Sequence, residues 1–209
     1  GHPMSLSPAV RPALNEGPGV RDHLQMSVET LAYLIIFVLA LGLRGLGLGA
    51  LPLNNSEAST ALAAWQVIHP GFPAAGGVGS PLAFLSALLG LSLIGPSGVA
   101  VRLLPMLAGL ALAFSPLLFR DRLGRISTLA AVLLLSLNPA AVSLSRQAEG
   151  YTFAVLGIVL MLKGLERFVT AGRQHSIIIA GAALGFALLA DYSSLLCLLM
   201  LAAAYGVML

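Results

Sequence analysis

Charged residues are scarce in this chain of 209 residues, of which only 9% are Asp, Glu, Lys or Arg. Soluble domains carry about 25% charged residues, so a water-exposed surface cannot be built from so few. Residues 58–101 contain no charged residue at all, and 58% of the chain is hydrophobic. Lipid can replace water as the solvent of such segments, because apolar side chains need no burial there. The sequence therefore predicts an all-α integral membrane protein.

Several other features are absent. A single cysteine, Cys197, excludes an intramolecular disulfide and leaves the redox compartment open. The chain contains no Walker or dinucleotide-binding fingerprint. It shows no internal repeat, which argues against a small transporter-like channel component. The net charge of +3 comes from basic residues that are scattered or sit in short loops, which is typical of membrane topology and not of nucleic-acid binding.

The apolar runs predict about seven transmembrane or re-entrant helices. They cover residues 28–46, 81–94, 99–119, 126–144, 151–169, 176–190 and 193–209. The run at 81–94 is shorter than the about 20 residues that a span needs. Arg44, near the end of the first run, is expected to extend its stem to the membrane interface.

Two regions are expected along the chain. Residues 1–27 form an N-terminal tail, whose first residues, Gly1-His2-Pro3 before Met4, resemble the remnant of a purification tag. Residues 28–209 form the membrane module. Its last apolar run reaches Leu209 without a polar flank, so we expect the module to continue in a longer protein.

The segment 47–80 is a long loop rich in glycine and proline. Within it, residues 56–68 are predicted to form a short helix that ends at His69-Pro70-Gly71. Because the segment is almost uncharged, we expect it to lie at the membrane surface. Basic residues predict two cytoplasmic loops, marked by Arg120, Arg122 and Arg125 and by Lys163, Arg167 and Arg173. Residues 47–80 would then be cytoplasmic if 81–94 spans the membrane, and extracytoplasmic if 81–94 is re-entrant.

Five stretches, in this order, resemble the N-terminal module of the GT-C superfamily of polyprenyl-phosphate-dependent glycosyltransferases, in its protein O-mannosyltransferase and aminoarabinose transferase-like group. They are LRGLGLGALPLNNSEASTALAA (43–64), SPLAFLSALLGLSLIGPSGVAVRLLPMLAGL (80–110), FRDRLGR (119–125), LLLSLNPAAVSLSRQAEGYTF (133–153) and GFALLADYSSLL (185–196). No single motif is specific, and the ordered set carries the resemblance.

The resemblance implies an inverting membrane glycosyltransferase that moves a sugar from a polyprenyl-phosphate donor to a protein, lipid or glycan acceptor. It also implies a multi-pass protein of the cell membrane whose active face is extracytoplasmic. The donor lipid and the membrane lipids are the expected partners, and the oligomeric state is left open. A non-catalytic GT-C-like scaffold or assembly subunit is the alternative.

Members of this family carry an acidic pair at the position of Asn54-Asn55-Ser56-Glu57. The resemblance implies that the Asp of this pair acts as general base on the acceptor hydroxyl. Such a transfer needs a carboxylate within hydrogen-bond reach of the attacking hydroxyl. This chain has Ser56 at the Asp position, which keeps a helix cap but loses the carboxylate. Two interpretations stay open: Glu57 is the base, or Glu57 is a first-turn acid stabilised by the helix dipole.

Departure of the phosphate needs a cation or a metal ion. Arg146 is the first candidate, because a guanidinium can bind a phosphate through two hydrogen bonds; the alternative is an interface anchor paired with Glu149. Arg102 is the second, and a buried structural ion is its alternative. A divalent metal stays open as a cofactor.

Three further candidates remain. Asp191, beside Tyr192, interrupts an apolar run where an acid is costly, and a helix-end residue is the alternative. His69 precedes Pro70 and more often ends a helix than holds a metal, since no second His stands at ligand spacing. Tyr151 follows the Arg146–Glu149 segment and completes the set of candidates.

Overall fold

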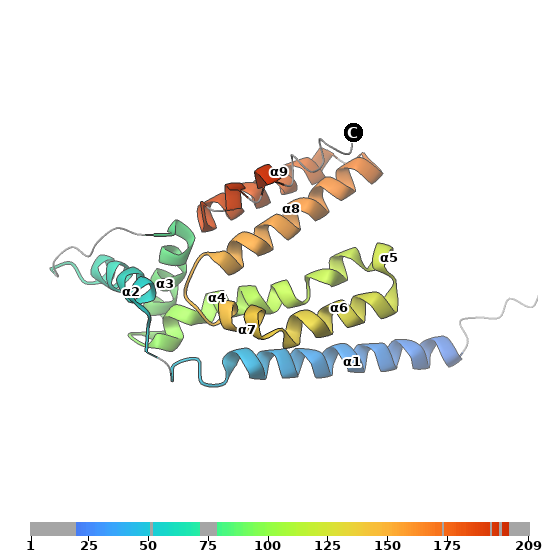
Figure 1. Cartoon of the computed structure of the whole chain (residues 1–209), viewed down its shortest axis with the longest axis horizontal. Helices are drawn as coiled ribbons and strands as arrows, with labels where there is room; N and C mark the ends of the chain where they lie inside the picture. Colours follow the sequence, from blue (N-terminus) through green and yellow to red (C-terminus); the bar gives the residue numbers. More distant parts are fainter. Residues whose placement is uncertain are drawn as a thin grey trace, which may run out of the picture. The chain divides into compact units, whose positions relative to one another are not determined.

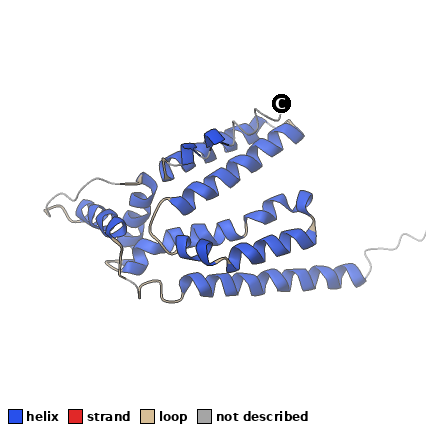
Figure 2. Ribbon diagram, viewed as in Figure 1, coloured by secondary structure: helices blue, strands red, loops and turns tan. Residues whose placement is uncertain are grey.

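A computed structural model describes residues 20–50, 52–71, 79–172, 174–192, 194–196 and 198–200, with side chains from Val28 onward. Every regular element in these ranges is a helix, which confirms the all-α prediction (Figure 2). The chain divides into two compact units, residues 1–35 and 36–209. All contacts discussed below lie within the second unit.

The helices follow one another along the chain in the order of the apolar runs (Figure 1). They are α1 (Val20–Gly45), α2 (Asn55–Ile68), α3 (Pro81–Ile94), α4 (Gly98–Ala113), the 3₁₀ turn η1 (Ser115–Phe119), α5 (Arg120–Leu123), α6 (Arg125–Leu137), α7 (Pro139–Ser145), α8 (Tyr151–Ala171) and α9 (Gln174–Ala190). The short helix predicted at 56–68 is confirmed as α2. Helix α1 begins at Val20 and not at Val28, so part of the expected tail is helical.

The count of seven spans is not confirmed. Two segments among the described residues, Val28–Gly45 and Gly98–Leu123, are long and apolar enough to cross a membrane. The pair α6 and α7 would make a third if it acts as one span bent by 61°. Helices α3 and α9 are apolar but shorter, and most of the predicted run 193–209 lies outside the described residues.

The single helix predicted over 126–144 is wrong, because Asn138-Pro139 breaks it into α6 and α7. Pro139 has no N–H to donate to the carbonyl of Leu135, four residues earlier. The next N–H, that of Ala140, donates instead to Asn138 Oδ1 at 2.9 Å. The carbonyls at the end of α6 are therefore left without their helical donors.

Arg44 supplies those donors from α1. Its guanidinium donates to the carbonyl oxygens of Ser136 at 3.1 Å and Leu135 at 3.2 Å. The side chain is 1% exposed, so the expectation that it extends to the membrane interface is wrong. Unsatisfied carbonyls away from water are costly, and this need outweighs the tendency of Arg to reach the interface. Arg44 thereby fixes the end of α1 to the bend between α6 and α7.

Glycines allow the closest helix contacts. Helices α8 and α9 lie side by side (Figure 1), and a Cβ added at Gly157 of α8 would lie 2.9 Å from both the carbonyl oxygen of Ala183 and Cβ of Ala187 in α9. Helix α4 likewise approaches α7 at Gly109, where an added Cβ would collide with the side chain of Ser145. Small residues permit such backbone approach in membrane helix pairs. The second contact holds α7, and with it the segment that follows, against α4.

We predict that Gly157→Ala lowers the unfolding temperature of the detergent-solubilised protein, because an added methyl overpacks the α8–α9 contact by about 1–3 kcal/mol. Gly181→Ala on α9 is the matched control. No described atom lies within 4 Å of a Cβ added there, so the gain in helix propensity should leave stability equal or slightly higher. Equal unfolding temperatures for Gly157→Ala and the wild type would contradict this packing.

Candidate active site

Glu57 lies in the first turn of α2, where a capping box fixes its side chain. The side chain of Asn54 accepts from the backbone N–H of Glu57 at 2.8 Å, and the backbone N–H of Asn54 donates to Glu57 Oε2 at 3.0 Å. This reciprocal pairing satisfies two donors that a helix start leaves open. It also turns the carboxylate back toward the loop that precedes the helix.

The carboxylate of Glu57 meets Arg102 of α4 in a buried ion pair with two hydrogen bonds. Arg102 Nε donates to Oε1 at 3.0 Å, and Nη2 donates to Oε2 at 2.6 Å. The backbone N–H of Ala148 donates to Oε1 at 2.6 Å. With the bond from Asn54, each oxygen of Glu57 accepts two hydrogen bonds, and the residue is 1% exposed. The four acceptor positions of this carboxylate are therefore filled.

These contacts set the pKa of Glu57. Burial raises the pKa of its carboxyl, but the hydrogen bonds from Arg102, Ala148 and Asn54, together with the charge of Arg102, outweigh burial and hold the pKa below its usual range. Arg102 also donates to the carbonyl oxygens of Leu48 at 3.0 Å and Pro52 at 3.1 Å. The ion pair thus ties α2 and α4 to the loop that follows α1 and to the backbone at Ala148.

A cavity of about 470 Å³ opens beside this pair, and we call it the larger cavity. Its polar lining residues are Asn54, Glu57, Arg102, Ser143, Arg146 and Gln147. Its apolar lining residues include Leu43, Leu137, Pro139 and Val142. The fold therefore brings the predicted residues Glu57, Arg102 and Arg146 into one cavity. Such a cavity suits a ligand with a charged head and a hydrocarbon chain.

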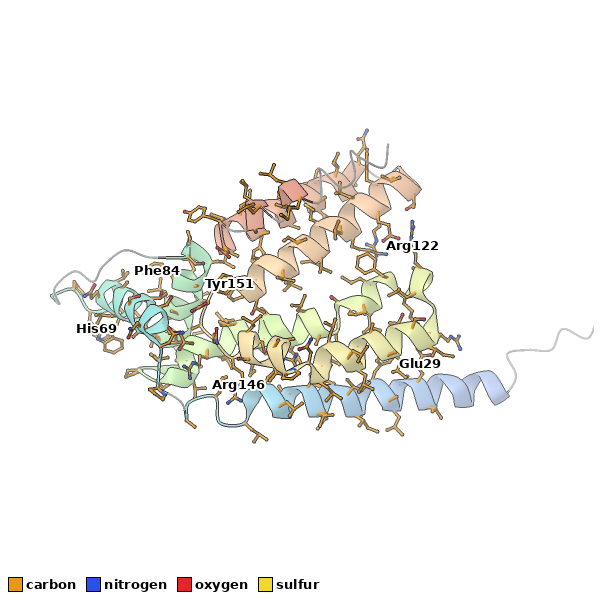
Figure 3. The ribbon with its side chains drawn as sticks, in the orientation of Figure 1. Glu29, His69, Phe84, Arg122, Arg146 and Tyr151 are labelled. Atoms are coloured by element: carbon orange, nitrogen blue, oxygen red, sulfur yellow. The ribbon has the colours of Figure 1, made fainter. Side chains whose placement is uncertain are left out.

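Arg146 caps the C-terminal end of α7, close to the loop that follows α1 (Figure 3). Its Nη2 donates to the carbonyl oxygens of Leu46 at 3.0 Å and Gly47 at 3.1 Å. Its Nε and Nη1 make no hydrogen bond with the part of the chain that the structure describes. These nitrogens can donate to a ligand in the larger cavity without loss of the two loop contacts.

A second cavity, of about 170 Å³, contains most of the other candidates, and we call it the smaller cavity. Its lining includes Ser56, Thr60, Ser80, Glu149, Tyr151 and Asp191. The segment 146–151 lines both cavities: Arg146 and Gln147 line the larger one, and residues 148–151 line the smaller one. The hydrogen bond from Ala148 to Glu57 fixes this segment at its centre.

Two candidates lie elsewhere. His69 ends α2, where its ring stacks on Trp65 with centroids 3.9 Å apart, and it lies apart from Arg146 and Tyr151 (Figure 3). Asn55 is an exposed first residue of α2 and lines neither cavity. In the described ranges, no three His, Cys, Asp or Glu residues are close enough to hold a metal ion.

Sequence reasoning missed three features of the site. These are the backbone N–H of Ala148, the hydroxyl of Thr60 and the side chain of Gln147. Thr60 carried a signal in retrospect, because it lies four residues after Ser56 and so on the same face of α2. Neither Ala148 nor Gln147 carried one, since their roles depend on contacts with residues far away in the sequence.

A family model described as dolichyl-phosphate-mannose-protein mannosyltransferase matches residues 78–209, which is more than half of the chain. No curated protein and no solved structure matches.

We predict that Arg102→Met lowers the free energy of unfolding by about 3–5 kcal/mol, because it leaves the Glu57 carboxylate buried without its partner. Arg122→Met is the matched control, since Arg122 pairs with Glu166 but its side chain is 60% exposed. The loss there should be much smaller, because ion pairs at exposed positions contribute little to stability. Chemical denaturation of the purified protein measures both, and similar losses would contradict the central role of the buried pair.

The same pair predicts a dependence on pH. A carboxyl whose folded pKa lies below its unfolded value stabilises the fold above the unfolded value and loses this effect as the pH falls. The stability difference between wild type and Glu57→Gln should therefore be largest above pH 4.5, the ordinary value, and shrink below it. A difference that grows on acidification would contradict the lowered pKa.

Proposed function

The chain belongs to the dolichyl-phosphate-mannose-protein mannosyltransferase family, and we propose that it transfers a sugar from a polyprenyl-phosphate donor to a hydroxyl of a protein, lipid or glycan. The family and the apolar helices mark a membrane glycosyltransferase of the GT-C type. The donor, the acceptor and the roles of individual residues are our proposal.

The larger cavity carries this proposal. The unengaged Nε and Nη1 of Arg146 would bind the donor phosphate with charge-assisted hydrogen bonds. The apolar lining residues Leu43, Leu137 and Val142 would contact the first isoprenoid units. A cavity lined by both arginines and apolar side chains fits a lipid phosphate better than a free sugar nucleotide.

The chemistry requires two kinds of group. As the bond between the sugar C1 and the phosphate oxygen breaks, negative charge grows on the phosphate, and Arg146 would stabilise it. A carboxylate must accept the proton of the attacking hydroxyl. The sequence leaves two interpretations of Glu57 open, as this base and as a first-turn acid. Because its four acceptor positions are filled, we propose a positioning role for Glu57, in which it orients Arg102 and the segment 146–151.

A non-catalytic scaffold is the second candidate function. The observation that favours it is the combination of Ser56, in place of an acid, with a saturated Glu57 carboxylate. A transfer assay on the full-length protein separates the two, since a scaffold would bind a partner protein without releasing dolichyl phosphate from its donor.

We predict that Arg146→Ala weakens binding of dolichyl-phosphate mannose to the full-length protein by about tenfold to a hundredfold, because hydrogen bonds to a charged group contribute about 1.5–3 kcal/mol. Arg146→Lys should recover only part of the affinity, since an ammonium lacks the planar fork. Titration with fluorescent donor in nanodiscs measures the dissociation constants. Arg167→Ala, an exposed arginine of α8 outside both cavities, is the control. Unchanged affinity in Arg146→Ala would contradict the donor site.

We propose that α2 and both cavities face the extracytoplasmic side. In a Cys197→Ser background, Ala58→Cys on exposed α2 should react with a membrane-impermeant maleimide added to intact cells. Leu123→Cys in the basic loop should react only after permeabilisation, because positive loops stay cytoplasmic. The reverse pattern would place the site in the cytoplasm.

A further inference from the structure

Glu149 differs from Glu57 in its free acceptor capacity. Its Oε1 accepts a single long hydrogen bond, from Asn54 Nδ2 at 3.4 Å, and its Oε2 accepts none from the described part of the chain. The side chain is half-buried and lines the smaller cavity. A carboxylate must keep an unoccupied lone pair in order to accept a proton. Glu149 meets this condition, and the saturated Glu57 does not.

Thr60 shows that the smaller cavity is suited to a polar ligand. The residue is only 6% exposed and lines the cavity, yet its hydroxyl makes no hydrogen bond with any described residue. A hydroxyl that lines a cavity can donate to a polar ligand and accept from it. Ser56 offers a second hydroxyl in the same cavity.

The segment 146–151 connects this cavity to the proposed donor site. Arg146 faces the larger cavity and Glu149, three residues later, faces the smaller one. Between them, the bond from Ala148 to Glu57 holds the backbone in place. One short segment therefore presents a cation to one cavity and an available carboxylate to the other.

We propose that Glu149 is the general base of the transfer and that the smaller cavity binds the acceptor hydroxyl; this rests on the function proposed above. The acceptor oxygen forms a bond to the sugar C1 while its proton moves to Glu149 Oε2. The bond between C1 and the phosphate oxygen breaks, and its electron pair stays with the polyprenyl phosphate, whose charge Arg146 meets. Product release and deprotonation of Glu149 by water complete the cycle.

One other acid lines the smaller cavity. Asp191 lies there, just past the end of α9, but it makes a further interaction. Ser56 lies in the smaller cavity as well, so an acid introduced there would face the same space as Glu149. A carboxylate at position 56 can therefore be tested as a replacement for that of Glu149.

The test uses the full-length protein in nanodiscs with radiolabelled dolichyl-phosphate mannose, and it measures both donor binding and the release of dolichyl phosphate. Glu149→Gln should lower turnover by about 10²–10⁴-fold and leave the donor dissociation constant within twofold. Ser56→Asp in the Glu149→Gln background should restore turnover by at least about tenfold. Asp121→Asn, an exposed carboxylate outside both cavities, is the matched control and should match the wild type.

Three results would overturn the assignment. The first is a Glu149→Gln protein with turnover within threefold of the wild type. The second is loss of donor binding together with turnover, which would make Glu149 structural. The third is an Asp191→Asn or Glu57→Gln protein that loses turnover and still binds the donor, while Glu149→Gln keeps its turnover. A wild-type protein that neither binds nor cleaves the donor would instead overturn the proposed function, and with it this assignment.

Discussion

The ion pair between Glu57 and Arg102 organises the rest of the site, because it joins four parts of the chain in a region with few other charges. Its two residues belong to α2 and α4, while its hydrogen bonds reach the loop carbonyls of Leu48 and Pro52 and the backbone of Ala148. Removal of either partner would leave a buried charge without its counter-ion, which would weaken the packing of all four segments at once. Both residues of the pair line the larger cavity.

The pair also affects which acidic residue has free acceptor positions for a proton. A carboxylate that accepts four hydrogen bonds is a good structural centre, but it is a poor base for the same reason, since the bonds that hold it also stabilise its charged form. Proton transfer then falls to an acid that is close to the pair but less engaged. The Ala148 N–H places Glu149 in that position, one residue beyond the anchor point.

Local features of the fold were predictable from the sequence, and long-range contacts were not. The apolar runs, the Asn55-Ser56 start signal and the stop at Pro70 predicted where α2 and most other helices lie. The expected cap at Ser56 is wrong, because Asn54 caps α2 and Ser56 lies in its first turn. The break at Asn138-Pro139 was also predictable from the sequence, because proline disfavours the helical conformation for the residue before it. The partners of Arg44 and Arg102 were not, since they lie 92 and 45 residues away. Candidate catalytic residues could thus be chosen from the sequence. Which carboxylate has all its hydrogen-bond acceptor positions filled, and which has positions free to accept a proton, depends on tertiary contacts.

The break between α6 and α7 connects membrane packing to the site. A continuous helix over 126–144 would carry Arg146 along the axis of α6, whereas the 61° bend redirects the chain beside α4, where Gly109 lets α7 approach. Arg44 stabilises this bend by satisfying the carbonyls that Pro139 leaves open. The bend residue Pro139 and its neighbours Leu137 and Val142 line the larger cavity. The same helix break therefore positions Arg146, which we propose to bind the phosphate. It also places the apolar residues that would contact the lipid chain of the donor.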